Sequence, residues 1–294
     1  MNEMHGRICL ITGATSGIGK AAAEALAKRG AHVVLVARNQ LKGAAVRKEL
    51  IEASQNPQID LLLADFASLP AVVRLAEQVR QRYPQLHVLI NNAGGIFFGR
   101  QTTEDGFEMS FGVNHLAHFV LTTELLELLK ASAPARVITI SSNAEAVGRI
   151  HFDDLQRERF YWSFGAYAQS KLANLLFSYE LARRVAGSGV VANAVTPGPV
   201  ATNFGSGGNG MLRMFPWIFQ QIGTTPEQAA ATIVQLACDP AFAQISGKAF
   251  YQQRELQTSA HSYDQHTQQQ LWRISEELVA PFLPNTKQHM SIAS

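Results

Sequence analysis

The chain is poor in cysteine, and neither of its cysteines has a partner nearby in the sequence. Among 294 residues there are two, Cys9 in an apolar run near the start and Cys238 near the end. Disulfide frameworks and cysteine-rich metal sites need clustered cysteines, so neither is expected, and no metal site is predicted. We interpret both side chains as buried, unreactive thiols in a reducing compartment.

The sequence also lacks a long apolar run and a basic cluster. No stretch of ~20 residues is apolar enough to span a bilayer, and residues 1–7 lead into a strand-like run without an apolar signal segment. The formal net charge of +2 is spread along the chain, unlike the basic patch of a nucleic-acid or anionic-membrane surface. These absences predict a cytoplasmic protein with a small-molecule partner, without nucleic acid and without a membrane span.

Apolar residues make up 47% of the chain and charged residues 16%, as in ordinary globular proteins. Apolar runs of strand length alternate with longer helical patterns, which predicts βαβ units and a mainly parallel sheet. The predicted fold class is therefore α/β, a doubly wound Rossmann fold with helices on both faces of a seven-stranded sheet. The seven strands are expected at residues 7–12, 32–37, 59–64, 87–91, 135–141, 190–195 and 248–251.

The first helix is predicted over residues 18–29. Small side chains at Ala21, Ala22 and Ala25 would allow this helix to pack closely on the sheet. Gly30 then stands where a left-handed residue commonly ends a helix.

No internal repeat, low-complexity tract or Pro/Ser-rich linker divides the chain, so residues 1–294 are predicted to be one dinucleotide-binding and catalytic domain. At about 203–223 a glycine-rich piece precedes an apolar piece. Two interpretations stay open there: a hinged substrate flap, or a loop with a short amphipathic helix packed on the body. The polar, Gln-rich segment at about 264–294 predicts a surface helix with a frayed end.

A glycine-rich turn, Thr12-Gly13-Ala14-Thr15-Ser16-Gly17-Ile18-Gly19, follows the first predicted strand and leads into a helix. Glycines let the backbone approach a pyrophosphate, and the N-terminus of the helix offers free N–H groups to its charge. A plain structural turn is the alternative interpretation. The predicted cofactor contacts here are Gly13, Thr15, Ser16, Gly17, Ile18 and Gly19.

The end of the second predicted strand bears on the choice of cofactor. No Asp or Glu occurs between Gly30 and Lys48, whereas Arg38 and Lys42 do. An acidic residue here would bind the free ribose hydroxyl of NAD, while a guanidinium suits the 2′-phosphate of NADP. The sequence therefore favours NADP(H), and a solvated surface arginine is the alternative.

Polar and small residues also follow the third and fourth predicted strands. Asp65 follows the third strand, and Asn91-Asn92-Ala93-Gly94 follows the fourth. In an open α/β sheet such residues lie beside the ligand crevice, although Asn and Gly are common in any loop. We predict cofactor contacts at Asp65, Asn91, Ala93 and Gly94.

Tyr167 and Lys171 are four residues apart in a helical pattern that continues to Val185, so they share a helix face. A free tyrosine, with a pKa of ~10, exchanges protons poorly near neutral pH. A nearby ammonium group stabilises the phenolate, and we expect Lys171 to lower the pKa of Tyr167 enough for general acid–base chemistry. Taken alone, this spacing also fits an ordinary surface pair.

The order of these motifs resembles the short-chain dehydrogenase/reductase family over nearly the whole chain. The resemblance rests on the glycine turn, Asn-Asn-Ala-Gly, the Ser141-Ser142 pair after the fifth strand, Tyr167 with Lys171, and Pro197-Gly198 after the sixth. It implies that Tyr167 exchanges a proton with the substrate oxygen while a hydride passes to or from nicotinamide. Lys171 would lower the pKa of Tyr167 and hold the nicotinamide ribose.

The family's remaining catalytic residues map onto Ser142, which would hydrogen-bond the substrate carbonyl or alcohol, and Asn114, which would support a water relay. A structural, helix-breaking role is the alternative for Asn114. Further cofactor contacts implied by the resemblance are Lys20, Tyr167, Lys171, Pro197, Gly198, Val200 and Thr202. Family members often form homodimers through the tyrosine-bearing helix and its neighbour.

One departure points to a branch of the family. Ser142 and Tyr167 lie 25 positions apart, about twice the usual interval. With the segments 113–119 and 170–174, this interval resembles the retinol dehydrogenase-like branch, which generally prefers NADP(H). The sequence shows no N-terminal apolar anchor, so retinoid turnover in a membrane is not expected. For His115, His118 and His151 we expect packing or surface roles.

The predicted function is an NADP(H)-dependent oxidoreductase, an alcohol dehydrogenase or carbonyl reductase. It would transfer a hydride between nicotinamide and a lipophilic carbonyl or alcohol substrate, with Tyr167 as general acid or base. Two alternatives stay open. One is a regulatory protein that senses NADP(H) with the same fold, and the other is an NAD-preferring alcohol dehydrogenase.

Overall fold

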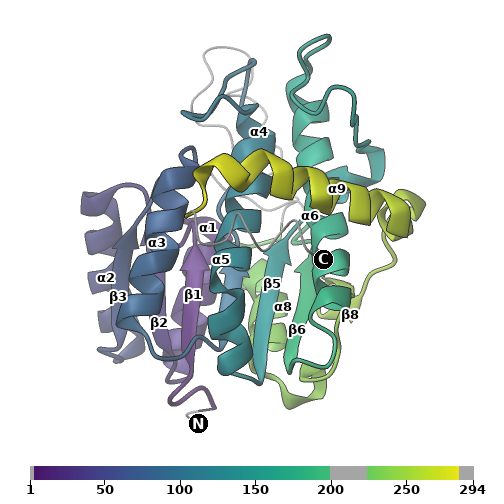
Figure 1. Ribbon diagram of the computed structural model, residues 1–294. Coiled ribbons are helices and arrows are strands. Elements are labelled where there is room, and N and C mark those ends of the chain that lie inside the picture. The colour runs from purple at the N-terminus through teal and green to yellow at the C-terminus, as the bar shows by residue number, and fades with distance from the viewer. Residues whose placement is uncertain (1–2, 199–223, 285–294) are drawn as a thin grey trace.

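The computed structural model describes residues 3–198 and 224–284, which form a mainly parallel sheet with helices on both faces (Figure 1). The predicted doubly wound α/β fold is confirmed. Eight strands lie in the order β3-β2-β1-β4-β5-β6-β7-β8, and only the pair β7 and β8 is antiparallel. The strands are β1 Ile8–Thr12, β2 His32–Ala37, β3 Ile59–Leu63, β4 Val88–Asn91, β5 Ala135–Ile140, β6 Val190–Val195, β7 Ala249–Tyr251 and β8 Arg254–Glu255.

The prediction of seven strands was one short, because β8 has only two residues and both are exposed. No apolar pattern marks so short an edge strand. The turn before it is formed by Gln252 and Gln253, with φ of 45° and 64°, rather than by the glycine or asparagine that signals a hairpin.

Two helical layers cover the sheet, with α1, α2 and α8 on one face and α3, α5, α6 and α9 on the other (Figure 1). Along β1, Leu10 faces the second layer while Cys9 and Ile11 face the first, as the alternation of a strand requires. The helices are α1 Gly17–Lys28, α2 Gln40–Ser54, α3 Leu69–Arg82, α4 Met109–Phe111, the π-helical η1 Gly112–Leu116, α5 Ala117–Ala131, η2 Asn143–Val147, α6 Ser163–Arg184, α8 Pro226–Cys238, η4 Pro240–Phe242, η5 Ala260–Tyr263, α9 Gln265–Val279 and η6 Ala280–Phe282.

The first helix lies within one residue of its predicted bounds, and Gly30 has the left-handed φ expected, 86°. The roles of the small residues need a correction. Ala22 is fully buried, but Ala21 and Ala25 are only partly buried and line a groove between α1 and α8. They face α8 because residues three or four apart share one side of a helix, and Ala22 lies on another.

The C-terminal segment contains a helix, as the sequence analysis predicts. This helix, α9, packs on the body through the buried Leu271, Trp272 and Val279. Residues 285–294 and the whole of the flap predicted at about 203–223 lie outside the described residues. Within the described ranges, no helix has the length and apolarity needed to cross a bilayer.

Candidate active site

The predicted site residues follow the carboxyl ends of neighbouring parallel strands. Gly13 follows β1, Arg38 follows β2, Asp65 comes two residues after β3, Ala93 comes two residues after β4 and Ser142 comes two residues after β5. Because the strands β1 to β6 run parallel, these residues gather at one edge of the sheet, where open α/β sheets bind their ligands.

The glycine turn has no room for a side chain at Gly13 or at Gly19. Gly13 has φ of 66°, and a Cβ there would lie 2.8 Å from the Cα of Ala93. A Cβ on Gly19 would overlap the side-chain amide of Asn92. Ser16, the residue before α1, makes no side-chain capping bond to the helix. The turn therefore fits the phosphates of a dinucleotide, which bind main-chain N–H groups at a helix N-terminus.

Asn92 holds this turn in place, and the sequence analysis missed its role. Its Nδ2 donates to the carbonyl oxygens of Thr12 at 2.8 Å and Gly13 at 3.2 Å. The predicted contact Asn91 points elsewhere: its side chain is fully buried and donates to Thr122 Oγ1 at 2.8 Å. Alternation along β4 was the available signal, because consecutive side chains of an extended chain point to opposite sides.

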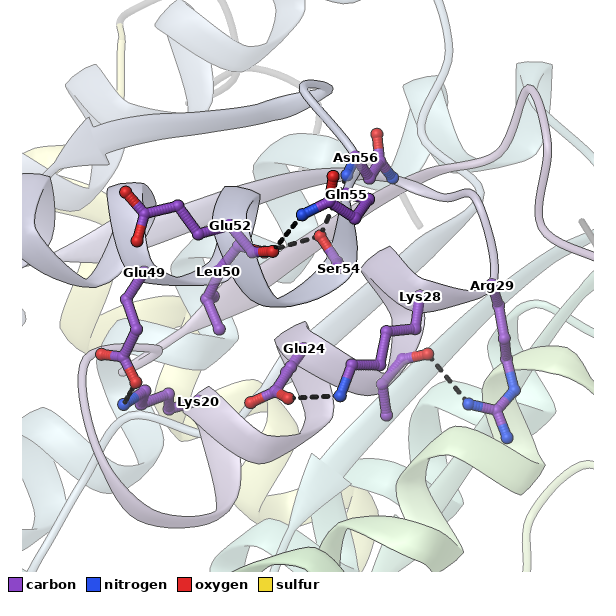
Figure 2. Close-up of polar contacts among 11 residues, drawn as sticks. Lys20, Glu24, Lys28, Arg29, Glu49, Leu50, Glu52, Ser54, Gln55 and Asn56 are labelled. Atoms are coloured by element: carbon purple, nitrogen blue, oxygen red, sulfur yellow. Dashed lines mark hydrogen bonds and ion pairs between the residues drawn. The ribbon is translucent and has the colours of Figure 1, made fainter.

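Arg38 is exposed and forms no ion pair with any residue in the ranges 3–198 and 224–284. Its guanidinium is therefore available to an anion. Lys20 is differently placed, because its Nζ contacts Glu49 Oε1 of α2 at 2.6 Å (Figure 2). The side chain of Lys20 therefore points towards α2 and not towards the glycine turn.

The other predicted cofactor contacts are placed as follows. Asp65 accepts a hydrogen bond from the Ala67 N–H at 3.0 Å. Gly198 has φ of 76°, and a Cβ there would lie 2.8 Å from the ring of Tyr251. Pro197 precedes it in the segment after β6, while Val200 and Thr202 lie outside the described residues.

Asn114 lies in the π-helical segment η1 and is completely buried. Its Oδ1 accepts from the Gly95 N–H at 2.9 Å, and its Nδ2 donates to the Gly95 carbonyl at 3.0 Å and to Ser170 Oγ at 2.9 Å. A Cβ on Gly94 would overlap Oδ1. The side chain thus joins the loop after β4 to α6, and π-helical turns are often found at functional sites.

The structure brings Ser142, Tyr167 and Lys171 together. The side chains of Tyr167 and Ser142 are hydrogen-bonded, and Ser142 Oγ also accepts from the Ala144 N–H at 3.2 Å. Lys171 Nζ lies 5.6 Å from the centre of the Tyr167 ring and donates to the Ile140 carbonyl at 3.1 Å. Ser141 Oγ donates to the Lys171 carbonyl at 2.8 Å, which fixes α6 against the end of β5.

This geometry can be compared with known proteins. A family model described as short chain dehydrogenase matches residues 7–209 of the chain. The chain belongs to the short chain dehydrogenase family. The resemblance to its retinol dehydrogenase-like branch is confirmed as well. Retinol dehydrogenase 12 of Mus musculus is 41% identical over 278 residues, covering 94% of this chain and 87% of that protein. Retinol dehydrogenase 11 of Homo sapiens gives the same percentages over 277 residues.

Solved structures of other proteins agree with the fold. An uncharacterized protein from Mycobacterium paratuberculosis has a TM-score of 0.75 and 32% identity, with 94% of each chain covered. A protein from Escherichia coli CFT073, described as a short chain dehydrogenase and complexed with NADPH, has a TM-score of 0.68 and 26% identity. That match covers 86% of this chain and 99% of the other.

The electrostatics of this short chain dehydrogenase correct one prediction. Burial raises the pKa of Tyr167, and the hydrogen bond with Ser142 opposes that rise. Burial also lowers the pKa of Lys171 to about 8. The sequence analysis predicted a lowered pKa for Tyr167 because it considered the charge of Lys171 but not the burial of both side chains, which disfavours the charged form of each.

Proposed function

We propose that the chain is an NADP(H)-dependent oxidoreductase that interconverts a lipophilic carbonyl compound and its alcohol. One observation carries the proposal: Tyr167 is hydrogen-bonded to Ser142 beside the buried Lys171. These residues lie at the carboxyl-terminal edge of the sheet, where the glycine turn also lies. A hydroxyl pair at this edge can hydrogen-bond the oxygen of a substrate. The nearby ammonium can stabilise the negative charge that develops during proton transfer.

Each residue has a defined part in carbonyl reduction. NADP(H), when bound, supplies the hydride or accepts it in the reverse direction. Tyr167 donates its proton to the carbonyl oxygen, and its raised pKa keeps the phenol protonated at neutral pH. Ser142 donates a hydrogen bond to the same oxygen, and Lys171 stabilises the phenolate left behind. Asn114 holds α6 to the loop after β4.

Two features of the described residues support the choice of cofactor. Arg38 offers an unpaired guanidinium after β2, where no carboxylate competes for the ribose. The glycine turn and the N-terminus of α1 offer main-chain N–H groups to the pyrophosphate of a dinucleotide.

An aromatic surface beside Tyr167 supports a lipophilic substrate. The Phe164 ring centre lies 6.3 Å from that of Tyr167 and 5.3 Å from that of Trp162. Phe164 is 38% exposed and Trp162 is 57% exposed. Covering such rings with an apolar substrate removes apolar area from water, which favours binding.

The test is turnover of NADPH by the purified chain with a panel of apolar aldehydes and ketones, retinal among them. Tyr167→Phe should lower kcat/KM by roughly 100-fold or more, since general acid catalysis contributes about that much. Tyr179→Phe is the matched control, because Tyr179 lies on the same helix and its hydroxyl contacts Thr258 Oγ1 at 2.9 Å. The control should retain wild-type kcat/KM.

The proposal fails if no member of the panel consumes NADPH, or if Tyr167→Phe turns over as fast as the wild type. Tight NADPH binding without turnover would instead favour the regulatory protein considered above.

A further inference from the structure

His118 is a buried histidine between the glycine turn and the catalytic residues. It is the second residue of α5, directly after the π-helical segment that carries Asn114. Its exposed fraction is 1%, and its ring centre lies 5.2 Å from that of Phe66. Packing alone would require only an apolar ring at this position. Both ring nitrogens, however, have polar partners.

These partners determine which nitrogen carries the proton. Nδ1 lies 3.0 Å from the carbonyl oxygen of Asn114, and a carbonyl can only accept. Nδ1 is therefore the donor. In a neutral ring Nε2 is then an acceptor, and the hydroxyl of Thr12 lies 3.1 Å from it.

The hydroxyl of Thr12 has three kinds of neighbour. Its oxygen accepts from the main-chain N–H groups of Asn92 at 2.8 Å and Ala93 at 2.9 Å. Its proton can go to His118 Nε2, or to the Ile90 carbonyl at the longer distance of 3.3 Å. Donation to His118 leaves both oxygen lone pairs for the two N–H groups, so the histidine orients the hydroxyl that holds the loop after β4.

We propose that His118 is a positioning residue that couples the loop formed by residues 92–95 to the main chain of Asn114. This inference rests on the proposed function and names a residue that acts through Thr12 and Asn114 rather than on the substrate. One nitrogen fixes the cofactor side of the site through Thr12. The other fixes the catalytic side through the Asn114 carbonyl.

The coupling works only with a neutral ring, because a protonated Nε2 could not accept from Thr12. Burial lowers the pKa of His118 to about 4; the hydrogen bond to Asn114 opposes this fall, and the charge of Lys171 adds to it. The ring is therefore neutral throughout the range in which the enzyme would work.

The first experiment determines the tautomer in the wild-type protein. Nitrogen NMR of the His118 ring should show a proton on Nδ1 and none on Nε2 at neutral pH. A ring protonated on Nε2 overturns the proposal. This measurement needs no variant and no substrate.

The second experiment tests the hydrogen bond to Thr12 and the hydrogen bond to Asn114 separately. It uses two variants, each of which keeps only one of these hydrogen bonds. In His118→Gln the side-chain oxygen replaces the Nε2 acceptor, and in His118→Asn the side-chain amide replaces the Nδ1 donor. His118→Gln should keep the NADPH Kd within about twofold of the wild type and lower kcat about tenfold. His118→Asn should weaken NADPH binding about fivefold or more and lower kcat at saturating NADPH by less than about threefold.

His87 provides the matched control, since its Nδ1 accepts from the Ile8 N–H at 3.0 Å at the opposite end of β1. His87→Gln and His87→Asn should leave the NADPH Kd and kcat unchanged. Equal effects of the two His118 variants on both quantities, or no effect of either, overturn the proposal. If the wild type binds NADPH but turns over no substrate, the proposed function fails. The role of His118 is still tested in that case, by the tautomer of its ring and by the NADPH Kd of His118→Asn.

Discussion

We propose that a single exposed guanidinium, that of Arg38, makes this chain bind NADPH more tightly than NADH. Arg38 has no carboxylate partner among the described residues and follows β2 directly. Arg38→Asp should weaken NADPH binding about 10- to 100-fold, because hydrogen bonds to charged groups contribute roughly 1.5–3 kcal/mol. Binding of NADH should be unchanged or stronger. Fluorescence titration measures both dissociation constants.

Arg74→Asp is the control for that experiment, because Arg74 is equally an exposed arginine but lies within α3. It should leave both constants unchanged. Equal affinities of the wild type for NADPH and NADH would refute the assigned preference.

Individual site residues could be predicted from the sequence where they belong to a short motif. Ser142, Tyr167 and Lys171 meet as expected, since a spacing of four on one helix and a known strand order fix their approach. The pairing of Lys20 with Glu49 was not predictable, because it joins residues on two different helices. The raised pKa of Tyr167 depends on burial by the whole fold, which no local pattern reports.

At the scale of elements, the parallel strands were predictable because most of them are buried on both faces and therefore appear in the sequence as apolar runs. The π-helical η1 and the packing of α9 were not, because both depend on contacts between distant segments. Trp272 of α9 packs on Phe119 of α5 with ring centres 4.9 Å apart, and stacks on Phe177 of α6 at 5.7 Å. α9 therefore covers part of α5 and α6, the two helices through which the family resemblance suggests a homodimer.

Trp272→Ala should therefore lower the free energy of unfolding by about 3–5 kcal/mol, as is usual for removing a buried aromatic side chain. Urea denaturation measures the change. Arg273→Ala is the control, since the side chain of Arg273 is 70% exposed on the same helix, and it should change stability by less than about 0.5 kcal/mol. A loss below about 1 kcal/mol for Trp272→Ala would mean that α9 does not cover this face in solution.

At the scale of the whole molecule, buried histidines connect stability to pH. Burial lowers the pKa of His87, and it lowers those of His115 and His118 further. Burial lowers the pKa of His115 to about 3 and that of His118 to about 4, whereas an unfolded histidine titrates near ~6.5. Below about pH 6.5 the unfolded chain therefore binds more protons than the folded chain, so stability falls as the pH falls. Above that pH neither state is protonated at these positions, and their effect disappears.

Between about pH 7 and about pH 5, His115 and His118 should each reduce the free energy of unfolding by about 1 to 2 kcal/mol, and His87 should act in the same direction. Carboxylates with lowered pKa, such as Asp60, titrate below this window and do not contribute to the slope. Urea denaturation at several pH values between about pH 7 and about pH 5 measures this change in the free energy of unfolding. His118→Gln removes one titrating ring and should make the dependence shallower, while His5→Gln, which changes an exposed histidine, should not. A wild-type stability that is flat from about pH 7 to about pH 5 would show that the rings of His115 and His118 are not held neutral in the folded chain.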